Sequence, residues 1–346
     1  MRRVKLGLVG AGVMGARHIK AIDTIDALEL VCIADPAVGA QEICQARRIP
    51  QYPHAETMMQ AEELDAVIIA TPTEHHYSGA MVALAHGLTV LVEKPIAATV
   101  AQGEEISRFA RAQNCHVVIG HQRRYYPCTQ KAREIVQGRQ LGKLMAVSGQ
   151  WTLRKDISYY LAKWRQERSA GPVLTNLIHE IDLLRFICGD ILAVSAEITH
   201  HDQNFEKEDA AAIIIKFANN AVGSFVLSDR TPSPWTWEMA LGENKKFPRA
   251  SQNALRFMGT KGALEFPNLK LWSHPDKDGD WRDIIQSKEI ATPFIDAYKA
   301  QCEHLCAVVL GKQLPIIDAE NGTHSLDATL AVFDAATKGK RITLNS

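Results

Sequence analysis

Residues 4–15 read VKLGLVGAGVMG, and this stretch decides the fold of the N-terminal part of the chain. Its first six residues are almost all apolar, as expected of a strand that is buried on both faces. Gly10, Gly12 and Gly15 follow at the spacing G-x-G-x-x-G, where the strand should give way to a helix. In this context the pattern predicts a turn that binds the diphosphate of a dinucleotide, rather than a glycine turn with only a structural role.

Each glycine has its own expected part in that turn. Gly10 permits the tight bend, Gly12 lets the backbone approach a pyrophosphate, and Gly15 allows the helix to pack closely against the strand. The helix that opens with Val13 and Met14 should offer its free N–H groups and the positive end of its dipole to the phosphates.

Asp35 stands at the end of the second apolar segment, residues 28–34. An acidic residue about 20 positions beyond the glycines accepts hydrogen bonds from the adenosine ribose of a dinucleotide. The Asp35 carboxylate would repel a 2′-phosphate, and the following residues 36–38 supply no cation to bind one. We therefore expect NAD as cofactor, with NADP less favoured; the alternative is that Asp35 is only a turn residue.

Short apolar segments alternate with helical patterns up to about residue 120. Strands are expected at residues 4–9, 28–34, 66–70, 90–92 and 117–119, and helices at 14–22, 38–46, 75–86 and 100–112. This alternation predicts a doubly wound α/β domain with a parallel sheet. Ligands bind beyond the carboxyl ends of such strands, so Thr71 and Pro72 should line the cofactor groove. His76, at the start of the next helix, is expected there as a neutral groove residue.

The pattern changes after about residue 125 and predicts an α+β domain with a large, mostly antiparallel open sheet. Helices are expected at 129–137, 177–186, 296–310 and 325–337, and strands at 144–154, 194–198, 211–217, 223–228, 238–241, 255–258 and 263–266. We expect a Rossmann domain at residues 1–122 and a second domain at 123–346, to which the family resemblance described below assigns substrate binding and oligomerisation. The C-terminal helix should pack back towards the first domain.

Length and charge exclude several other classes of protein. The chain has 346 residues, with 39 Lys and Arg against 39 Asp and Glu, so it lacks the positive surplus needed to coat nucleic acid or anionic lipid. It has no run of about 18 uncharged apolar residues, so no membrane-spanning helix is expected. Its seven scattered cysteines suit free thiols in a reducing cytoplasm. A signal peptide at the N-terminus is disfavoured because Lys5 interrupts the apolar stretch.

The segment Val92-Glu93-Lys94-Pro95 ends the fourth expected strand of the parallel sheet. With the glycine turn and residues 70–76 before it, this segment resembles the Gfo/Idh/MocA oxidoreductase family, which includes glucose–fructose oxidoreductase and inositol 2-dehydrogenase. The resemblance extends over nearly the whole chain, through GHQRRY at 120–125, WR at 164–165, HEID at 179–182, GTKG at 259–262 and GKRI at 339–342.

The resemblance implies an NAD(P)-dependent oxidoreductase that transfers hydride between a secondary alcohol of a sugar or cyclic polyol and the nicotinamide. Lys94 would approach both the nicotinamide ribose and the reacting hydroxyl, next to a cis bond to Pro95, and its ammonium would stabilise the developing alkoxide. The cofactor-binding residues implied are Gly10, Gly12, Val13, Met14, Gly15, Asp35, Thr71, Pro72, His76, Glu93, Lys94, Gln122, Trp164 and Arg165.

A polar strip lies on the otherwise apolar helix around His179. Thr175, His179 and Asp182 are spaced four and three apart, which places them on one helical face, with Asn176 beside it. The family commonly has an Asp where Thr175 stands, so Asp182 is expected to orient the His179 imidazole instead. The alternative is a buried polar pair, His179 with Asp182, that only holds the domain together.

The expected catalytic residues are therefore Lys94, His179 and Asp182. The residues expected to hold the substrate are Lys94, Arg123, Arg154, Asn176, His179 and Trp235. In the family, the faces of the second domain's sheet pair between subunits, which implies a homodimer or homotetramer through the C-terminal sheet.

Three alternatives to a dehydrogenase remain open. The chain could reduce a keto-sugar, an anhydro-sugar or an imine, because the residues do not fix the direction of hydride transfer. It could also be a non-catalytic, dinucleotide-sensing regulator, although the presence of Lys94 and His179 argues against this. A zinc site at His200-His201-Asp202 is the third alternative; no zinc-binding spacing supports it, so no metal is expected.

Overall fold

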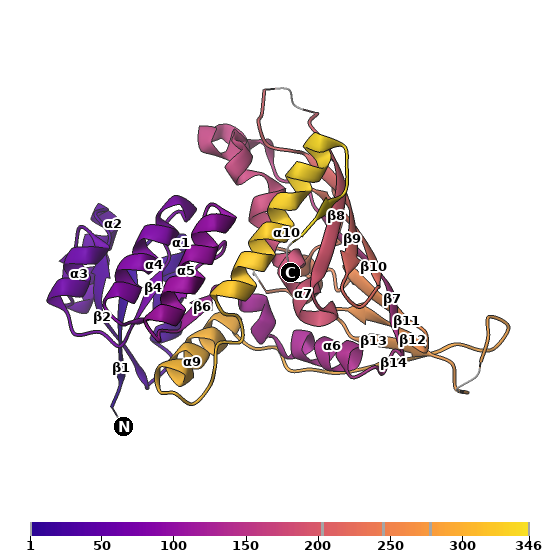
Figure 1. The fold of residues 1–346 in the computed structure, drawn as a ribbon, viewed down its shortest axis with the longest axis horizontal. Helices are drawn as coiled ribbons and strands as arrows, with labels where there is room; N and C mark the ends of the chain where they lie inside the picture. The colour runs from indigo at the N-terminus through magenta and orange to yellow at the C-terminus, as the bar shows by residue number, and fades with distance from the viewer. Residues whose placement is uncertain (1, 202–203, 244–245, 277–278, 345–346) are drawn as a thin grey trace. The chain divides into compact units, whose positions relative to one another are not determined.

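The computed structural model describes residues 2–201, 204–243, 246–276 and 279–344 (Figure 1). The chain forms two compact units: the first joins the residues up to Tyr125 with Ile295–Leu326, and the second consists of Tyr126–Phe294 and the residues from Asp327 onward. The expected division at residues 122 and 123 assigns 295–326 to the second domain, whereas the structure packs this segment in the first unit.

The described strands of the first unit form a six-stranded sheet in the order β3-β2-β1-β4-β5-β6. All neighbouring strands are parallel, which confirms the doubly wound α/β fold. The strands are β1 (Val4–Val9), β2 (Leu28–Ala34), β3 (Gln51–Tyr52), β4 (Ala66–Ile69), β5 (Thr89–Val92) and β6 (Val117–Ile119). Because β1 lies between β2 and β4, the chain reverses direction across the sheet beside the glycine turn.

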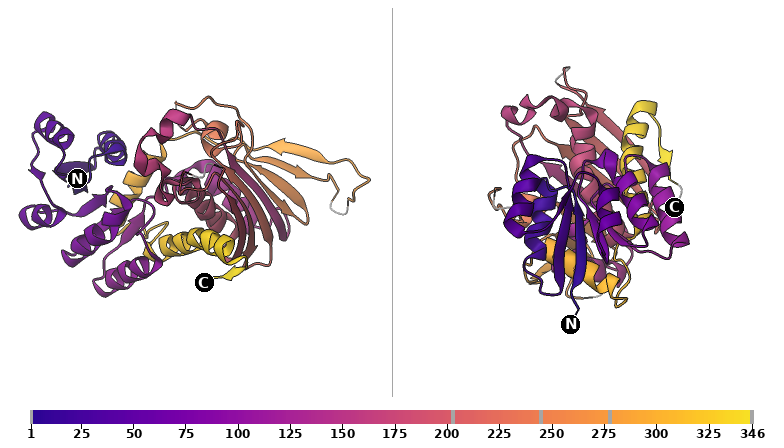
Figure 2. Two further views of the ribbon diagram at one scale, coloured as in Figure 1. Left: turned by 90° about the horizontal axis from the view of Figure 1, so that it is seen from above. Right: turned by 90° about the vertical axis from the view of Figure 1, so that its left-hand side faces the viewer.

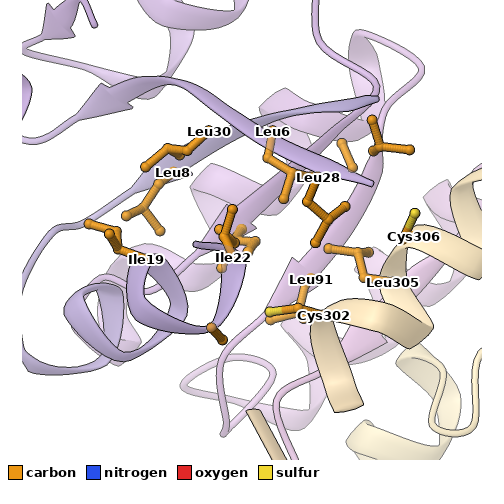
Figure 3. Close-up of a cluster of buried hydrophobic side chains, with 14 of the residues drawn as sticks. Leu6, Leu8, Ile19, Ile22, Leu28, Leu30, Leu91, Cys302, Leu305 and Cys306 are labelled. Carbon is orange, nitrogen blue, oxygen red and sulfur yellow. The ribbon is translucent and has the colours of Figure 1, made fainter. Parts of the chain in front are cut away.

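Helices lie on both sides of this sheet, as the right-hand view of Figure 2 shows. They are α1 (Val13–Ile22), α2 (Val38–Arg47), α3 (Ala55–Ala61), α4 (His76–Ala85), α5 (Val100–Ala112) and, from the later segment, α9 (Ala297–Val309). Helix α9 packs on α1 and contributes Cys302, Leu305 and Cys306 to a buried cluster that includes Leu6 and Ile19 (Figure 3). The later segment thereby completes the core of the first unit.

The described part of the second unit contains a nine-stranded sheet in the order β14-β13-β12-β11-β7-β10-β9-β8-β15. Only β10 and β7 are parallel among its neighbouring pairs, so the sheet is mostly antiparallel, as predicted. The strands are β7 (Leu144–Thr152), β8 (Ile191–Thr199), β9 (Ala210–Phe217), β10 (Val222–Ser228), β11 (Leu255–Gly259), β12 (Gly262–Phe266), β13 (Lys270–Ser273), β14 (Gln286–Glu289) and β15 (Ile342–Thr343).

Helices α6 (Pro127–Gln137) and α7 (Ile178–Cys188) lie on one face of this sheet (Figure 1). Along β9 and β10 the residues alternate between buried and exposed, so Ile213 and Phe225 face the core while Ile214 and Val226 face outward. The remaining long helix is α10 (Ala319–Lys338). Short helical segments are η1 (Thr73–His75), η2 (Gln122–Tyr125), η3 (Ile157–Leu161), η4 (Lys163–Gln166), η5 (Arg168–Ala170) and η6 (Val173–Leu177). No helix in these described ranges is long and apolar enough to cross a membrane.

The strand expected at residues 238–241 is wrong, because these residues form helix α8 (Trp237–Leu241). The hydroxyl of Thr236 accepts a hydrogen bond from the backbone N–H of Met239 at 3.1 Å and caps the helix. Trp237 and Ala240, three residues apart, are both buried. A cap followed by this helical spacing outweighs the apolar composition that suggested a strand.

Candidate functional site

The glycine turn lies at the carboxyl edge of the parallel sheet, between β1 and α1. Gly10 has a φ of 89°, and a Cβ atom there would lie 2.7 Å from the carbonyl oxygen of Ala70 at the end of β4. A Cβ atom on Gly12, by contrast, would meet nothing within 4 Å. Gly15 faces the backbone of Gly10. The turn is therefore tight against the protein on one side and open at Gly12, which fits the roles expected for the three glycines.

The first turn of α1 is suited to an anion. The helix begins at Val13 after Gly12, no side chain caps it, and it has no acidic residue in its first turn. Val13 is 79% exposed, while Met14 packs partly against the core. The first N–H groups of a helix have no partner within the helix, so these positions fit the pyrophosphate of a dinucleotide.

Asp35 follows β2 at the same edge and is bonded to the turn itself. One carboxylate oxygen accepts the backbone N–H of Ala11 at 2.7 Å, and the other accepts that of Ala37 at 2.8 Å. A carboxylate has about four lone-pair positions, so it can still accept hydrogen bonds from ribose hydroxyls. Its negative charge beside the turn disfavours a 2′-phosphate.

Thr71, Pro72 and His76 follow β4, next to the glycine turn. Thr71 is half-buried and Pro72 is exposed at the start of η1. His76 is buried, and its two ring nitrogens lie 2.9 Å from the carbonyl oxygen of Thr71 and 2.6 Å from that of Pro95. The imidazole thus connects the turn after β4 to the turn after β5.

Glu93, Lys94 and Pro95 form the turn after β5, and the Lys94-Pro95 bond is cis, as the resemblance implies. The carboxylate of Glu93 contacts the ring of His18, from α1, at 2.7 Å, and its other oxygen accepts the backbone N–H of Lys94 at 3.2 Å. Lys94 is half-buried at the carboxyl edge of the sheet. After β6, Gln122 and Arg123 are buried in η2.

In the second unit, a π-helical segment, η6, leads into α7. The expected placement of Thr175 on one face with His179 assumes a continuous α-helix, and this assumption is wrong for residues 173–177. The Thr175 hydroxyl donates to the carbonyl oxygen of Gly171 at 2.9 Å, and the same oxygen accepts the backbone N–H of Thr175 at 3.0 Å. His179 and Asp182 both lie within α7, so these two share a face as predicted.

The other residues expected to bind ligands are also placed in the second unit. His179 and Asn176 are half-buried, whereas Asp182 is buried. Trp164 and Arg165 lie in η4, with the Arg165 guanidinium 4.1 Å from the centre of the Tyr159 ring. Arg154 and Trp235 are exposed, on the segments that follow β7 and β10.

Sequence reasoning missed two buried polar groups. His18 lies on the buried face of α1, three residues after Gly15, and a polar residue on that face was the available signal. The other group centres on Lys207, which is fully buried and bonded to Asp209 and Asp229 at 3.0 Å each. Lys207 lies within the charged run Glu206-Lys207-Glu208-Asp209, and no sequence pattern marked it as buried.

The zinc alternative gains no support from the residues that the structure describes. His200 lies 3.0 Å from the carbonyl oxygen of Lys207, while Asp202 falls outside the described residues. Within the described part of the chain, no group of three or more His, Cys, Asp or Glu side chains is arranged to hold a metal ion.

The chain matches the two domains of one family. Residues 4–121 match the profile described as "Oxidoreductase family, NAD-binding Rossmann fold", and residues 133–344 match that of its C-terminal alpha/beta domain. The scyllo-inositol 2-dehydrogenase (NAD(+)) of Bacillus subtilis (strain 168) is 24% identical over 351 aligned residues, which cover 99% of this chain and 97% of that protein.

Two further proteins are similar to this chain, one in sequence and one in fold. The rhizopine catabolism protein MocA of Rhizobium meliloti is 28% identical over 237 residues, covering 67% of this chain and 73% of that protein. The structure of the WlbA dehydrogenase of Bordetella pertussis, in complex with NADH and UDP-GlcNAcA, shares the fold with a TM-score of 0.80, 21% identity and full coverage of both chains.

Both domain matches and the geometry of the glycine turn lead to the same assignment. The first unit carries an NAD-binding Rossmann sheet with a glycine turn, and the second carries the C-terminal alpha/beta domain of the same family. The chain belongs to the Gfo/Idh/MocA family of NAD(P)-dependent oxidoreductases.

Proposed function

We propose that this enzyme oxidises a secondary alcohol of a sugar or cyclic polyol with NAD. The observation that carries the proposal is the position of Lys94 in the turn at the carboxyl edge of the Rossmann sheet. Both neighbours of Lys94 in this turn are held by side-chain contacts, Glu93 by His18 and the Pro95 carbonyl by His76, and Glu93 also accepts the backbone N–H of Lys94. The names of the inositol dehydrogenase and of the sugar-nucleotide complex support a hydroxyl-rich substrate.

Lys94 and His179 divide the chemistry in this proposal. His179 takes the proton of the reacting hydroxyl, because an imidazole is well suited to proton transfer near pH 7. The Lys94 ammonium stabilises the negative charge that develops on the oxygen. Bound NAD supplies the acceptor for the hydride. Asp182 acts through His179, as a positioning residue.

The remaining proposed roles follow the same division between cofactor and substrate. Gln122, Trp164 and Arg165 assist cofactor binding. Arg123, Arg154, Asn176 and Trp235 hold the hydroxyl groups or the ring face of the substrate. None of these roles is needed for the central test, which concerns Lys94.

Replacing Lys94 by Ala removes the ammonium and leaves the glycine turn and Asp35 in place. We expect kcat to fall by at least a hundredfold, since one preorganised electrostatic group contributes about 10²–10³. The dissociation constant of NAD, measured by fluorescence titration, should change by less than a few-fold. Lys20→Ala, on the exposed face of α1, is the matched control and should leave both values unchanged. A Lys94→Ala enzyme with more than half the parental rate contradicts the role of Lys94.

The substrate class and direction need a screen rather than a variant. Cyclitols, aldoses, sugar acids and amino sugars are assayed with NAD and NADP, and the corresponding keto-sugars and anhydro-sugars with NADH. We expect oxidation of at least one cyclic polyol or sugar with NAD. Turnover only in the reductive direction supports the reductase alternative, and binding of NAD without any turnover supports a regulator.

We also propose that the enzyme is a homodimer or homotetramer that assembles through the outer face of the nine-stranded sheet. Ile214, on this face, is 62% exposed, and Val222 and Val226 are exposed beside it. Apolar patches of this kind on a sheet usually mark an interface. All seven cysteines are free thiols, which supports a cytoplasmic location.

A further inference from the structure

A histidine and a glutamate form a buried pair beneath the turn that carries Lys94. His18, from α1, has no exposed surface, and Glu93, at the end of β5, is 3% exposed. The Nε2 atom of His18 lies 2.7 Å from one carboxylate oxygen of Glu93. The second oxygen accepts the backbone N–H of Lys94 at 3.2 Å, so the pair is linked directly to the residue at the reaction centre.

The surroundings allow the Glu93 carboxylate little freedom. A Cβ atom on Gly120, at the end of β6, would lie 2.8 Å from the second carboxylate oxygen, so the carboxylate occupies space that only glycine leaves open. The backbone N–H of Glu93 donates to the carbonyl oxygen of Ile69 at 2.9 Å. Strands β4 and β6 therefore fix Glu93 from both sides, and α1 supplies the partner for its charge.

Helix α9 closes the far side of the His18 ring. The Nδ1 atom of His18 lies 3.9 Å from the Sγ atom of Cys302, and the ring meets that of Tyr298 edge to face with centroids 5.8 Å apart. The titratable groups that face the pair are thus Cys302 and Tyr298 from α9 and Lys94 on the turn itself. The carboxylate that His18 contacts is that of Glu93.

Electrostatics favour the charged form of this pair. Burial alone would lower the pKa of His18, but hydrogen bonds to Cys302 and Glu93 raise it well above its ordinary value. Burial would raise the pKa of Glu93, yet His18 and Lys94 lower it. A buried ion pair gains little net stability over apolar residues of the same size, so stability alone gives weak grounds for its presence here.

We propose that His18 is a positioning residue for the reaction: it fixes the Glu93 carboxylate, which in turn holds the backbone of Lys94 and so places the ammonium. This inference rests on the proposed function of Lys94. It requires that disturbing His18 slows the chemical step while leaving NAD and substrate binding in place. A misplacement of about 1 Å in such a group can cost about 10² in rate.

Two substitutions of His18 separate the hydrogen bond from the filling of space. In His18→Gln the amide nitrogen replaces Nε2 as a donor to Glu93, whereas His18→Phe fills the site with a ring that has no donor. We expect kcat to fall by roughly a hundredfold in His18→Phe and by less than tenfold in His18→Gln. KM and the dissociation constant of NAD should stay within about twofold. His86→Gln, at an exposed histidine at the end of α4, is the matched control.

The pH profile gives a readout that a purely structural role would not move. In His18→Gln the carboxylate of Glu93 loses one of its two cations and keeps Lys94, so its pKa rises and the acid limb of kcat should shift upward by roughly one pH unit. Glu93→Gln removes the negative charge of the same pair instead of the positive one. The double variant His18→Gln/Glu93→Gln should be no slower than the slower single variant, because both changes break the same link.

The outcomes distinguish this inference from the proposed function. If Lys94→Ala is inactive while His18→Phe and His18→Gln keep the parental kcat per folded molecule and the parental acid limb, His18 is structural only and the inference is wrong. If Lys94→Ala retains turnover, the proposed function itself fails. Should His18→Phe not fold, the kcat and acid limb of His18→Gln and Glu93→Gln decide the matter.

Discussion

Asp35 has a structural role, and we propose that it also sets cofactor preference. Its carboxylate holds the backbone of Ala11 in the glycine turn and that of Ala37 at the start of α2. The negative charge therefore lies at the glycine turn, the proposed site of the dinucleotide diphosphate. A 2′-phosphate brought to this place would meet a like charge, which costs on the order of 1 kcal/mol in a solvated site.

Asp35→Asn tests this reading of cofactor preference. The amide keeps one oxygen acceptor and removes the charge, so we expect the ratio of kcat/KM for NAD over NADP to fall by about tenfold, equivalent to about 1.4 kcal/mol. Steady-state kinetics with both cofactors measure the ratio. Glu29→Gln, at an exposed position on β2, should leave this ratio unchanged. An unaltered ratio in Asp35→Asn would show that another residue excludes NADP.

The glycine turn and Asp35 were predictable from the sequence because each depends on local requirements. Gly10 needs a positive φ, Gly12 needs open space, and Asp35 needs only to follow the second strand. These residues are therefore recognised by their spacing along the sequence. His18 could not be recognised in this way. Its partner Glu93 lies 75 residues away, and no local pattern announces that pairing.

At the scale of elements, the start of the helix that carries His179 depends on a carboxylate from outside it. Glu208 is buried beside Gly171, and one of its oxygens accepts the backbone N–H of Val173 at 2.6 Å. Burial raises the pKa of the Glu208 carboxyl. This long-range bond supplies an acceptor for the first N–H of the π-helical segment, and the spacing of residues 173–182 alone does not encode it.

Glu208→Ala and Glu208→Gln separate the hydrogen bond from the charge. The alanine leaves a buried N–H without its acceptor, so we expect the free energy of unfolding to fall by about 1–3 kcal/mol, with a lower kcat. The glutamine keeps an acceptor for this N–H and should change the free energy of unfolding by less than about 1 kcal/mol. Urea unfolding measures both. Glu206→Ala, at an exposed neighbour, is the control; equal losses in both Glu208 variants would refute the bond's role.

A second element-scale prediction concerns acid stability of the Lys207 network. Burial alone would raise the pKa of Asp209, but hydrogen bonds from Arg230, Lys207 and the backbone of His201 hold it well below its ordinary value. A carboxylate with a depressed pKa in the folded state contributes stability above its unfolded pKa of about 3.9, and this is lost as pH falls further. The native enzyme should therefore lose stability steeply below about pH 4.

Asp209→Asn removes the titrating group from this network. We expect it to be less stable by roughly 3 kcal/mol at neutral pH, because Lys207 and Arg230 lose a buried partner. Between pH 5 and pH 3, however, its free energy of unfolding should fall less than that of the native enzyme. Urea titrations at several pH values give both quantities, and parallel pH curves for the two proteins would contradict the assignment to Asp209.

At the scale of the whole molecule, the two halves of the chain were distinguishable by their periodicities, but the course of the C-terminal segment was not. The apolar spacing of residues 296–310 predicts a helix and is satisfied by any apolar partner. The structure uses this helix to complete the core of the first unit, through Cys302 and Leu305 against Ile19. Which of two cores receives a helix depends on tertiary packing, which the helical period alone does not encode.

The outer face of the nine-stranded sheet leads to the prediction for the assembled enzyme. In the register of β9 and β10, Ile214 lies opposite Ser224 and Ala212 opposite Val226, so a strip of apolar and small side chains faces outward. A hollow of about 390 Å³ lies over β8–β10 beside Lys340 and Arg341. A second copy that covers this strip would remove its apolar side chains from water, which favours association at about 25 cal/mol per Å² buried.

Ile214→Asp/Val226→Asp should break that association, because a dimer would bury two uncompensated carboxylates on each side. We expect the native enzyme to be a dimer or tetramer by light scattering, and the double variant to be a monomer with an unchanged circular dichroism spectrum and unchanged NAD affinity. Leu314→Asp, an equivalent change at an exposed residue of the first unit, should not alter the mass. A native monomer, or a variant that keeps the native mass, would show that this face is not the interface.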